Sequence, residues 1–104
     1  MKILSKQIFE QRVKMIKKVK IKIFGDVQGV FFRYSAKEKA WQLGLKGWAE
    51  NADDGTVEIT AEGEEENLKK FIDWCYAGPP MAKVEKTEIE WQEAKNEFQE
   101  FMIK

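Results

Sequence analysis

Apolar and polar residues alternate in the segment Lys18–Ile23, where every second residue is valine or isoleucine and the others are lysines. This alternation is typical of a β-strand with one face buried and the other in water. Beyond two glycines the apolar residues recur with helical spacing instead, at Phe32, Ala36, Ala40 and Leu43. Gly44 follows where a left-handed C-terminal cap is expected. The pattern therefore predicts a strand, a glycine loop and a helix in succession.

The middle of the chain has the pattern of a β-hairpin. A short strand is expected over Lys46–Asn51 and a second one over Thr56–Glu62, where apolar and polar residues alternate. Asp53, Asp54 and Gly55 lie between them. Because Asp and Gly tolerate the positive φ angles of tight turns, these residues suit a hairpin connection.

A second helix is predicted directly after the hairpin. Three glutamates, Glu64–Glu66, open it with the charge that suits a helix N-terminus. Its buried stripe is expected to consist of Leu68, Phe71, Ile72 and Cys75. The helix must end before Gly78-Pro79-Pro80, because neither proline can continue it. Two further strands are expected, over Val84–Glu93 and Phe98–Ile103.

The predicted order is β-α-β-β-α-β followed by a short C-terminal strand. Two β-α-β halves joined in this way form the split β-α-β, or ferredoxin-like, fold of the α+β class, an antiparallel sheet with both helices on one face. The 104 residues suffice for one domain with one core. We expect that domain over residues 17–104. Residues 1–16 form an N-terminal extension with an imperfect amphipathic stripe, which we expect to fray or pack loosely.

Composition excludes several kinds of chemistry. The chain has no histidine and a single cysteine, Cys75, which we expect in the core. Histidine-based acid–base catalysis, Cys/His nucleophile pairs and the usual zinc sites are thereby excluded, and no metal site is expected. Lys and Arg (18) balance Asp and Glu (18), so the net charge does not indicate a nucleic-acid partner. No apolar run approaches the ~20 residues of a membrane span, and we expect a cytoplasmic protein.

The junction between the first strand and the first helix is the candidate site. Backbone N–H groups at a helix N-terminus lack helical partners, and Gly25 and Gly29 allow successive N–H groups to turn toward one anion. The helix dipole adds partial positive charge there. Arg33 in the first helical turn is electrostatically misplaced unless an anion binds, in which case its guanidinium can hold two phosphate oxygens. A phosphate group is therefore the expected ligand.

Two common phosphate-binding motifs do not fit this loop. A dinucleotide fingerprint requires G-x-G-x-x-G, whereas the loop has G-x-x-x-G. A P-loop requires Lys and then Ser or Thr directly after its last glycine. Here Gly29 is followed by Val30 and Phe31 instead.

Four segments resemble the acylphosphatase family. They are GDVQGVFFR (residues 25–33), GLKGWAEN (44–51), DGTVEITAEG (54–63) and GPPMAKVE (78–85). The similarity covers about residues 18–104, and its first block is specific because few other families end a strand and open a helix with such a string. Phe31 occupies a variable position of that motif. The N-terminal extension is the one feature that the family pattern does not account for.

The resemblance implies a hydrolase that cleaves the carboxyl–phosphate bond of a small acyl phosphate without metal or cofactor. It implies that Arg33 binds the phosphate and that Asn51 positions the attacking water. Loop N–H groups would complete the phosphate site, with Gln28 acting through its backbone; the loop residues are Gln28, Gly29, Val30, Phe31 and Phe32. Inorganic phosphate would be both product and inhibitor, and we expect a monomer.

The chemistry of the residues agrees with this implication. An acyl phosphate leaves as a carboxylate, which is stable near neutral pH and needs no general acid. Phosphoryl transfer then requires mainly positioning and charge stabilisation, so the absence of histidine is compatible with it. The amide of Asn51 can hold a water molecule, although it is no Brønsted base.

Other interpretations stay open on the residues alone. Outside the motif, Arg33 is typical of a solvated helix surface and Asn51 of a turn. Split β-α-β domains also bind single-stranded RNA on the open sheet face, here through Lys18, Lys20, Lys22 and Trp48. A domain that binds a phosphorylated ligand without turnover is a third interpretation. We expect packing in the core or on a sheet face for all four tryptophans, Trp41, Trp48, Trp74 and Trp91.

Overall fold

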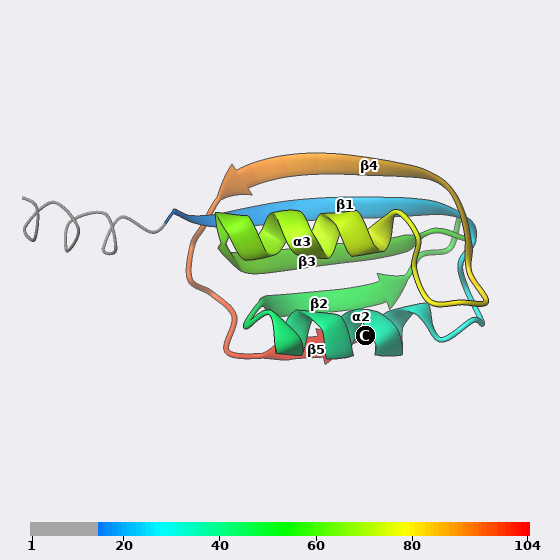
Figure 1. The fold of residues 1–104 in the computed structure, drawn as a ribbon, viewed down its shortest axis with the longest axis horizontal. Helices are drawn as coiled ribbons and strands as arrows, with labels where there is room; N and C mark the ends of the chain where they lie inside the picture. Colours follow the sequence, from blue (N-terminus) through cyan, green and yellow to red (C-terminus); the bar gives the residue numbers. More distant parts are fainter. Residues whose placement is uncertain (1–14) are drawn as a thin grey trace, which may run out of the picture.

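The computed structural model describes residues 15–104, and the predicted stripe of the N-terminal extension lies almost wholly outside them. The described part contains five strands and two helices (Figure 1). In chain order they are β1 (Ile16–Asp26), α2 (Phe32–Gln42), β2 (Lys46–Asn51), β3 (Val57–Glu64), α3 (Glu65–Cys75), β4 (Lys83–Glu93) and β5 (Phe101–Ile103).

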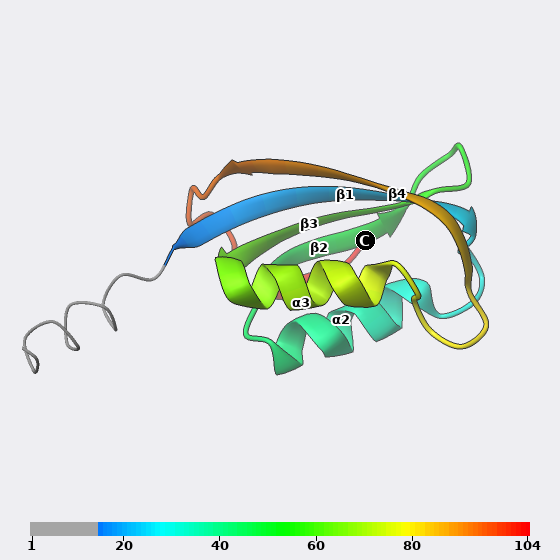
Figure 2. The same ribbon diagram turned by 45° about the horizontal axis from the view of Figure 1, so that its top comes forward.

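The strands form one sheet in the order β4-β1-β3-β2-β5, and both helices cover the same face of it (Figure 2). β1 pairs antiparallel with β3 and β4, and β2 pairs antiparallel with β3. The ferredoxin-like fold predicted from the sequence is therefore confirmed. The expectation of a wholly antiparallel sheet was wrong at one edge, because β5 lies parallel to β2.

The parallel pairing follows from the route of the chain after β4. β4 ends at the end of the sheet where β2 begins, and residues 94–100 cross that end to reach the far edge (Figure 1). Two N–H groups of this crossing, those of Lys95 and Asn96, donate to the buried Glu62 carboxylate at 2.7 and 3.1 Å. The final strand is shorter than predicted because the crossing uses residues up to Glu100.

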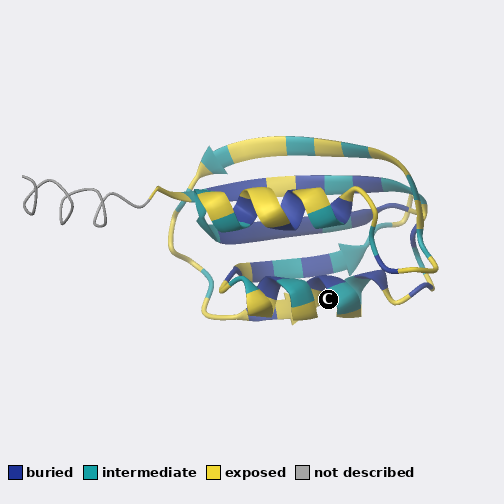
Figure 3. Cartoon of the chain, in the orientation of Figure 1, coloured by how far each residue is buried: buried dark blue, intermediate teal, exposed yellow. Residues whose placement is uncertain are grey.

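The core lies between the sheet and the helices, where Figure 3 shows the buried residues. The alternating face of β1 and the predicted stripes of both helices supply most of it. The rings of Phe32 and Trp74 join the two helices, with centroids 5.4 Å apart. Cys75 is buried as predicted, and this burial raises the pKa of its thiol.

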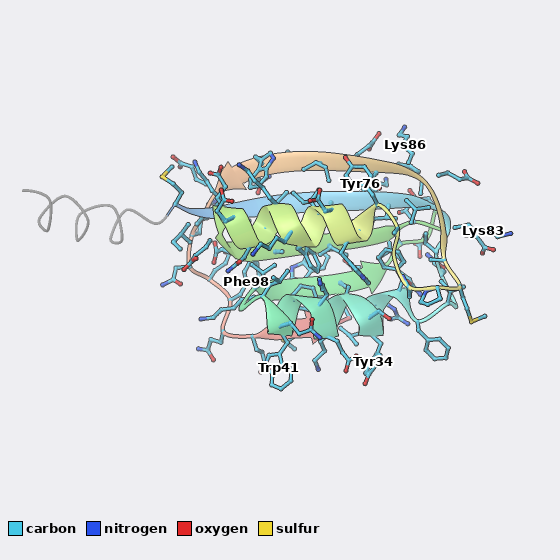
Figure 4. The ribbon with its side chains drawn as sticks, viewed as in Figure 1. Tyr34, Trp41, Tyr76, Lys83, Lys86 and Phe98 are labelled. Atoms are coloured by element: carbon cyan, nitrogen blue, oxygen red, sulfur yellow. The ribbon has the colours of Figure 1, made fainter. Side chains whose placement is uncertain are left out.

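The prediction for the tryptophans holds in part. Trp74 packs against the core, and Trp48 is half-buried on the open face of the sheet. Trp91 is 43% exposed on the edge strand β4. The prediction was wrong for Trp41, which is 83% exposed. The core-facing stripe of α2 includes Ala40, so the next residue points away from the sheet (Figure 4).

Candidate active site

The last residues of β1, just before the loop to α2, approach the β4 backbone closely. A Cβ on Gly25 would clash with the main-chain oxygen of Lys83, and the φ angle of Gly25 is 131°. Gly29 has a φ angle of 74°, again in the left-handed region. Glycine accepts both conditions at little cost because it lacks a Cβ. These two residues let the chain leave the sheet and reach the start of α2 over a short path.

Phe31 is the N-cap residue that immediately precedes α2, and it adopts a left-handed conformation with φ 65° and ψ 24°. For a bulky residue this conformation costs about 1 to 3 kcal/mol, and such strain is concentrated at functional sites. A phenyl ring cannot cap the helix, and the first turn contains no acidic residue. No side chain of α2 therefore satisfies the N–H groups of its first turn.

The backbone N–H groups of residues 28–32 have no hydrogen-bond acceptor among residues 15–104. The side chains of Val30 and Phe32 point into the core, which fixes the path of the loop. The structure thus leaves a run of backbone donors available at the positive end of the α2 dipole. This arrangement is suited to an anion.

Arg33 and Asn51 line the same cavity, of about 270 Å³, at this end of the sheet. Arg33 lies in the first turn of α2, and Asn51 is the last residue of β2, two elements that meet there (Figure 1). The side-chain amide of Asn51 forms no hydrogen bond with any of residues 15–104. The fold therefore brings together the two residues that the sequence motifs single out.

Arg33 is oriented by the end of β5, a contact that the sequence did not predict. Its Nη1 donates to the main-chain oxygen of Lys104 at 2.8 Å, across 71 residues of chain. The N–H of Lys104 in turn donates to the main-chain oxygen of Ala49 at 2.8 Å. The Nζ of Lys104 lies 4.2 Å from the ring centroid of Trp48. The backbone of β2 and the ring of Trp48 thus hold the residue that orients the guanidinium.

Gln28 was expected to act through its backbone, and the structure gives its side chain a contact as well. Its Nε2 donates to the main-chain oxygens of Ala52 and Thr56 at 2.8 and 2.9 Å. These oxygens flank the turn that follows Asn51. The side chain of Gln28 therefore ties the loop to the hairpin that carries Asn51. No periodicity or spacing in the sequence indicates this contact.

The hairpin turn is stabilised by Asp54. Its carboxylate accepts hydrogen bonds from Thr56, at 2.6 Å from Oγ1 and 3.1 Å from the backbone N–H, and it pairs with Lys22 Nζ at 3.0 Å. The bonds from Thr56, together with Lys22, lower the pKa of Asp54 to about 2. The turn next to Asn51 is thus ordered by charge and by hydrogen bonds near neutral pH.

Neither a metal-binding cluster nor a membrane-spanning helix is present in residues 15–104. No group of three or more His, Cys, Asp or Glu residues lies close enough to hold a metal ion in that part of the chain. No helix there is long and apolar enough to cross a membrane.

A family model described as acylphosphatase matches residues 19–103. The chain belongs to the acylphosphatase family. The acylphosphatase of Pyrobaculum islandicum is 51% identical over 82 residues, which are 78% of this chain and 86% of the relative. That of Pyrobaculum calidifontis is 45% identical over 100 residues, 95% of this chain and 90% of the relative. The solved acylphosphatase from Coxiella burnetii has a TM-score of 0.83 and 33% identity, over 89% of this chain and 99% of that one.

These similarities confirm the predicted family and the predicted enzyme class, an acylphosphatase acting on small acyl phosphates. The RNA-binding alternative is not favoured. The contacts made by side chains on the open face of the sheet also count against it. Lys18 and Lys22 form ion pairs of 2.9 and 3.0 Å with Glu97 and Asp54. The ring of Trp48 is covered by an ammonium group. Lys18, Lys22 and Trp48 of this face therefore already interact with other side chains of the acylphosphatase domain.

Proposed function

We propose that this acylphosphatase hydrolyses its substrate without a metal ion, with the phosphate held by Arg33 and by N–H groups of residues 28–32. Asn51 positions the attacking water. The single observation that carries the proposal is the shared cavity, in which Arg33 and Asn51 face the same space beside Gly29 and Phe31. The family membership supports the reaction, and the cavity supports the roles of these residues.

The unsatisfied donors of the loop support the phosphate site. An anion there accepts hydrogen bonds from N–H groups that otherwise have no protein acceptor, and it lies at the positive end of the α2 dipole. The anion also balances the charge of Arg33. Because Arg33 uses one nitrogen for Lys104, its remaining N–H groups can donate to phosphate oxygens.

The reaction then requires no protein acid. The water held by Asn51 attacks phosphorus, and the bond from phosphorus to the acyl oxygen breaks. The leaving group takes the bonding electron pair as a carboxylate, and a phosphate oxygen of the substrate accepts the proton of the water. Arg33 and the loop N–H groups stabilise the charge on the phosphoryl oxygens, which is the main task in this kind of transfer.

The binding of product follows from the same site. Inorganic phosphate resembles the part of the substrate that the loop holds, so it inhibits competitively in this proposal. We also propose that the protein is a monomer in the cytoplasm. One chain supplies Arg33, Asn51 and the loop, so the proposed site needs no second copy. The domain that performs the reaction spans residues 17–104, and residues 1–16 form an extension to it.

Hydrolysis of benzoyl phosphate by the purified protein, measured with and without EDTA, tests the proposal. We expect full activity in EDTA and competitive inhibition by inorganic phosphate. Activity that disappears in EDTA and returns with a divalent ion would contradict the metal-free mechanism. Non-competitive inhibition by phosphate would contradict the anion site in the loop.

A further inference from the structure

The cavity that contains Arg33 and Asn51 also has an apolar rim. Phe31, Tyr34 and Ile103 line it and are 70%, 55% and 39% exposed. They are three of the ten large apolar side chains of residues 15–104 that are exposed, and these three line one cavity. The phosphate chemistry described above uses none of these side chains.

Three different elements hold this rim in place. Phe31 comes from the loop, where its backbone adopts a left-handed conformation. Tyr34 comes from α2, and its hydroxyl is 3.3 Å from the carboxylate of Glu38. Ile103 comes from β5, opposite Ala49 of β2. The rim therefore forms only when the loop, α2 and β5 come together in the folded domain, and it is not simply the exposed face of one helix.

The cavity lining contains a single charged residue, Arg33. If Arg33 holds the phosphate, the rest of the lining has no cation for an acidic acyl group and no carboxylate for a basic one. An acyl group is joined to phosphorus through one oxygen atom, so its carbonyl lies next to the phosphate and the rest of the group lies at or near the rim. Its surroundings there are aromatic and aliphatic side chains.

We propose that Phe31, Tyr34 and Ile103 form an acyl subsite that selects acyl phosphates with an apolar or aromatic acyl group. This inference rests on the proposed function, because it takes the phosphate to be held by Arg33 and the loop. An apolar acyl group removes exposed apolar surface of the rim from water, whereas a methyl group covers little of it. The subsite therefore distinguishes substrates by the size and polarity of their acyl group.

The test compares benzoyl phosphate with acetyl phosphate, as the ratio of their kcat/KM values. We expect Tyr34→Ala and Phe31→Ala each to lower this ratio about fivefold or more relative to the unsubstituted protein, in keeping with the discrimination that apolar pockets achieve. Tyr34→Phe keeps the ring and should keep the ratio. The matched control is Tyr76→Ala at the end of α3. Tyr76 is also 55% exposed, but it does not line this cavity and it belongs to the other helix from Tyr34 (Figure 4).

The inhibition constant of inorganic phosphate separates the subsite from the phosphate site. Phosphate has no acyl group, so Tyr34→Ala should leave its inhibition constant nearly unchanged while the substrate ratio falls. Equal losses on both substrates, or an unchanged ratio in both variants, would overturn the acyl subsite. If the unsubstituted protein hydrolysed neither substrate, the proposed function itself would fail, and this result is distinct from hydrolysis with an unchanged ratio.

Discussion

Helices α2 and α3 are each 11 residues long and cover the same face of the sheet, but their first turns carry opposite charges. α3 begins with Glu65 and Glu66, and the N–H of Glu65 donates to the main-chain oxygen of Met15 at 2.8 Å. α2 begins after Phe31, has no acidic residue in its first turn and carries Arg33 there.

A helix N-terminus is stabilised by negative charge and destabilised by positive charge. α3 meets this requirement with its own residues, so its start contributes to folding and needs no ligand. α2 leaves its N-terminal donors without protein acceptors and adds a cation to them. This difference supports the proposal that the start of α3 contributes to stability and the start of α2 binds an anion from outside. The predictions below test whether the two roles can be separated.

The largest effect is expected at the α2 end, from Arg33→Ala. We expect kcat/KM to fall about a hundredfold or more, because hydrogen bonds to charged groups are worth about 1.5 to 3 kcal/mol each and Arg33 is proposed to donate more than one. The inhibition constant of inorganic phosphate should rise as well. Steady-state kinetics and phosphate titration measure both quantities.

The matched control for Arg33→Ala is Lys37→Ala, which removes an exposed cation one turn further along α2. It should change neither quantity by more than about twofold, because charges beyond the first turn contribute little to anion binding there. If both variants weakened phosphate binding equally, general positive charge would explain the binding, and the assigned role of Arg33 would be wrong.

Asn51→Ala should separate catalysis from binding at the same end. We expect kcat to fall by about two orders of magnitude, by analogy with the loss of one preorganised polar group from a hydrolytic site. The affinity for inorganic phosphate should stay nearly unchanged, because Asn51 is proposed to hold the water and not the anion. A correctly folded variant with near-normal kcat would show that Asn51 is only a strand-terminal residue.

The sequence predicted the elements well where the periodicity is strong. The alternation in β1 and the stripe of α3 are repeated over several pleats or turns, so their buried faces could be assigned. The buried stripe of α2 was also assigned, although this helix is only weakly amphipathic. The three-residue strand β5 has no such repetition, and its parallel pairing depends on where the chain crosses the end of the sheet. The exposure of Trp41 similarly depends on which side of α2 meets the sheet.

The candidate site was predicted from motifs and not from periodicity. The glycine loop and Arg33 gave a physical reason for an anion, while the role of Asn51 came from the family resemblance alone. The contacts of Arg33 with Lys104 and of Gln28 with the hairpin join segments 71 and up to 28 residues apart. One sequence contains no local signal for such pairs, because they are created only when the strands are in register.

Gln28→Met tests whether the loop at the α2 end depends on the hairpin. The change removes two hydrogen bonds while keeping a similar side-chain volume, and the oxygens of Ala52 and Thr56 retain backbone donors. We expect about a tenfold loss of kcat, with a smaller change in phosphate affinity, because Asn51 and the loop lose their fixed relative position. Gln92→Met is the control, since the Gln92 amide bonds only Glu90 on the exposed face of β4. A change in thermal stability alone, with normal kcat, would make Gln28 a purely structural residue.

The smallest effect is expected at the start of α3, from the double substitution Glu65→Gln and Glu66→Gln. Removing both charges should lower the free energy of unfolding by about 0.3 to 1 kcal/mol per residue at low ionic strength. Each negative charge interacts favourably with the positive end of the helix dipole, and this interaction is lost. Glu65 also pairs with Lys69 at 3.2 Å, one turn along the helix, which adds a few tenths of a kcal/mol. High salt should reduce the difference, since these charges are screened by ions. Urea denaturation at two salt concentrations measures the loss, and the kinetics of the same variant should match those of the unsubstituted protein.

Arg33→Ala should have the opposite effects, with lost activity and no comparable loss of stability. If the α3 variant instead lost phosphate affinity, the two helix starts would be coupled, and the separation of stability from anion binding would not hold.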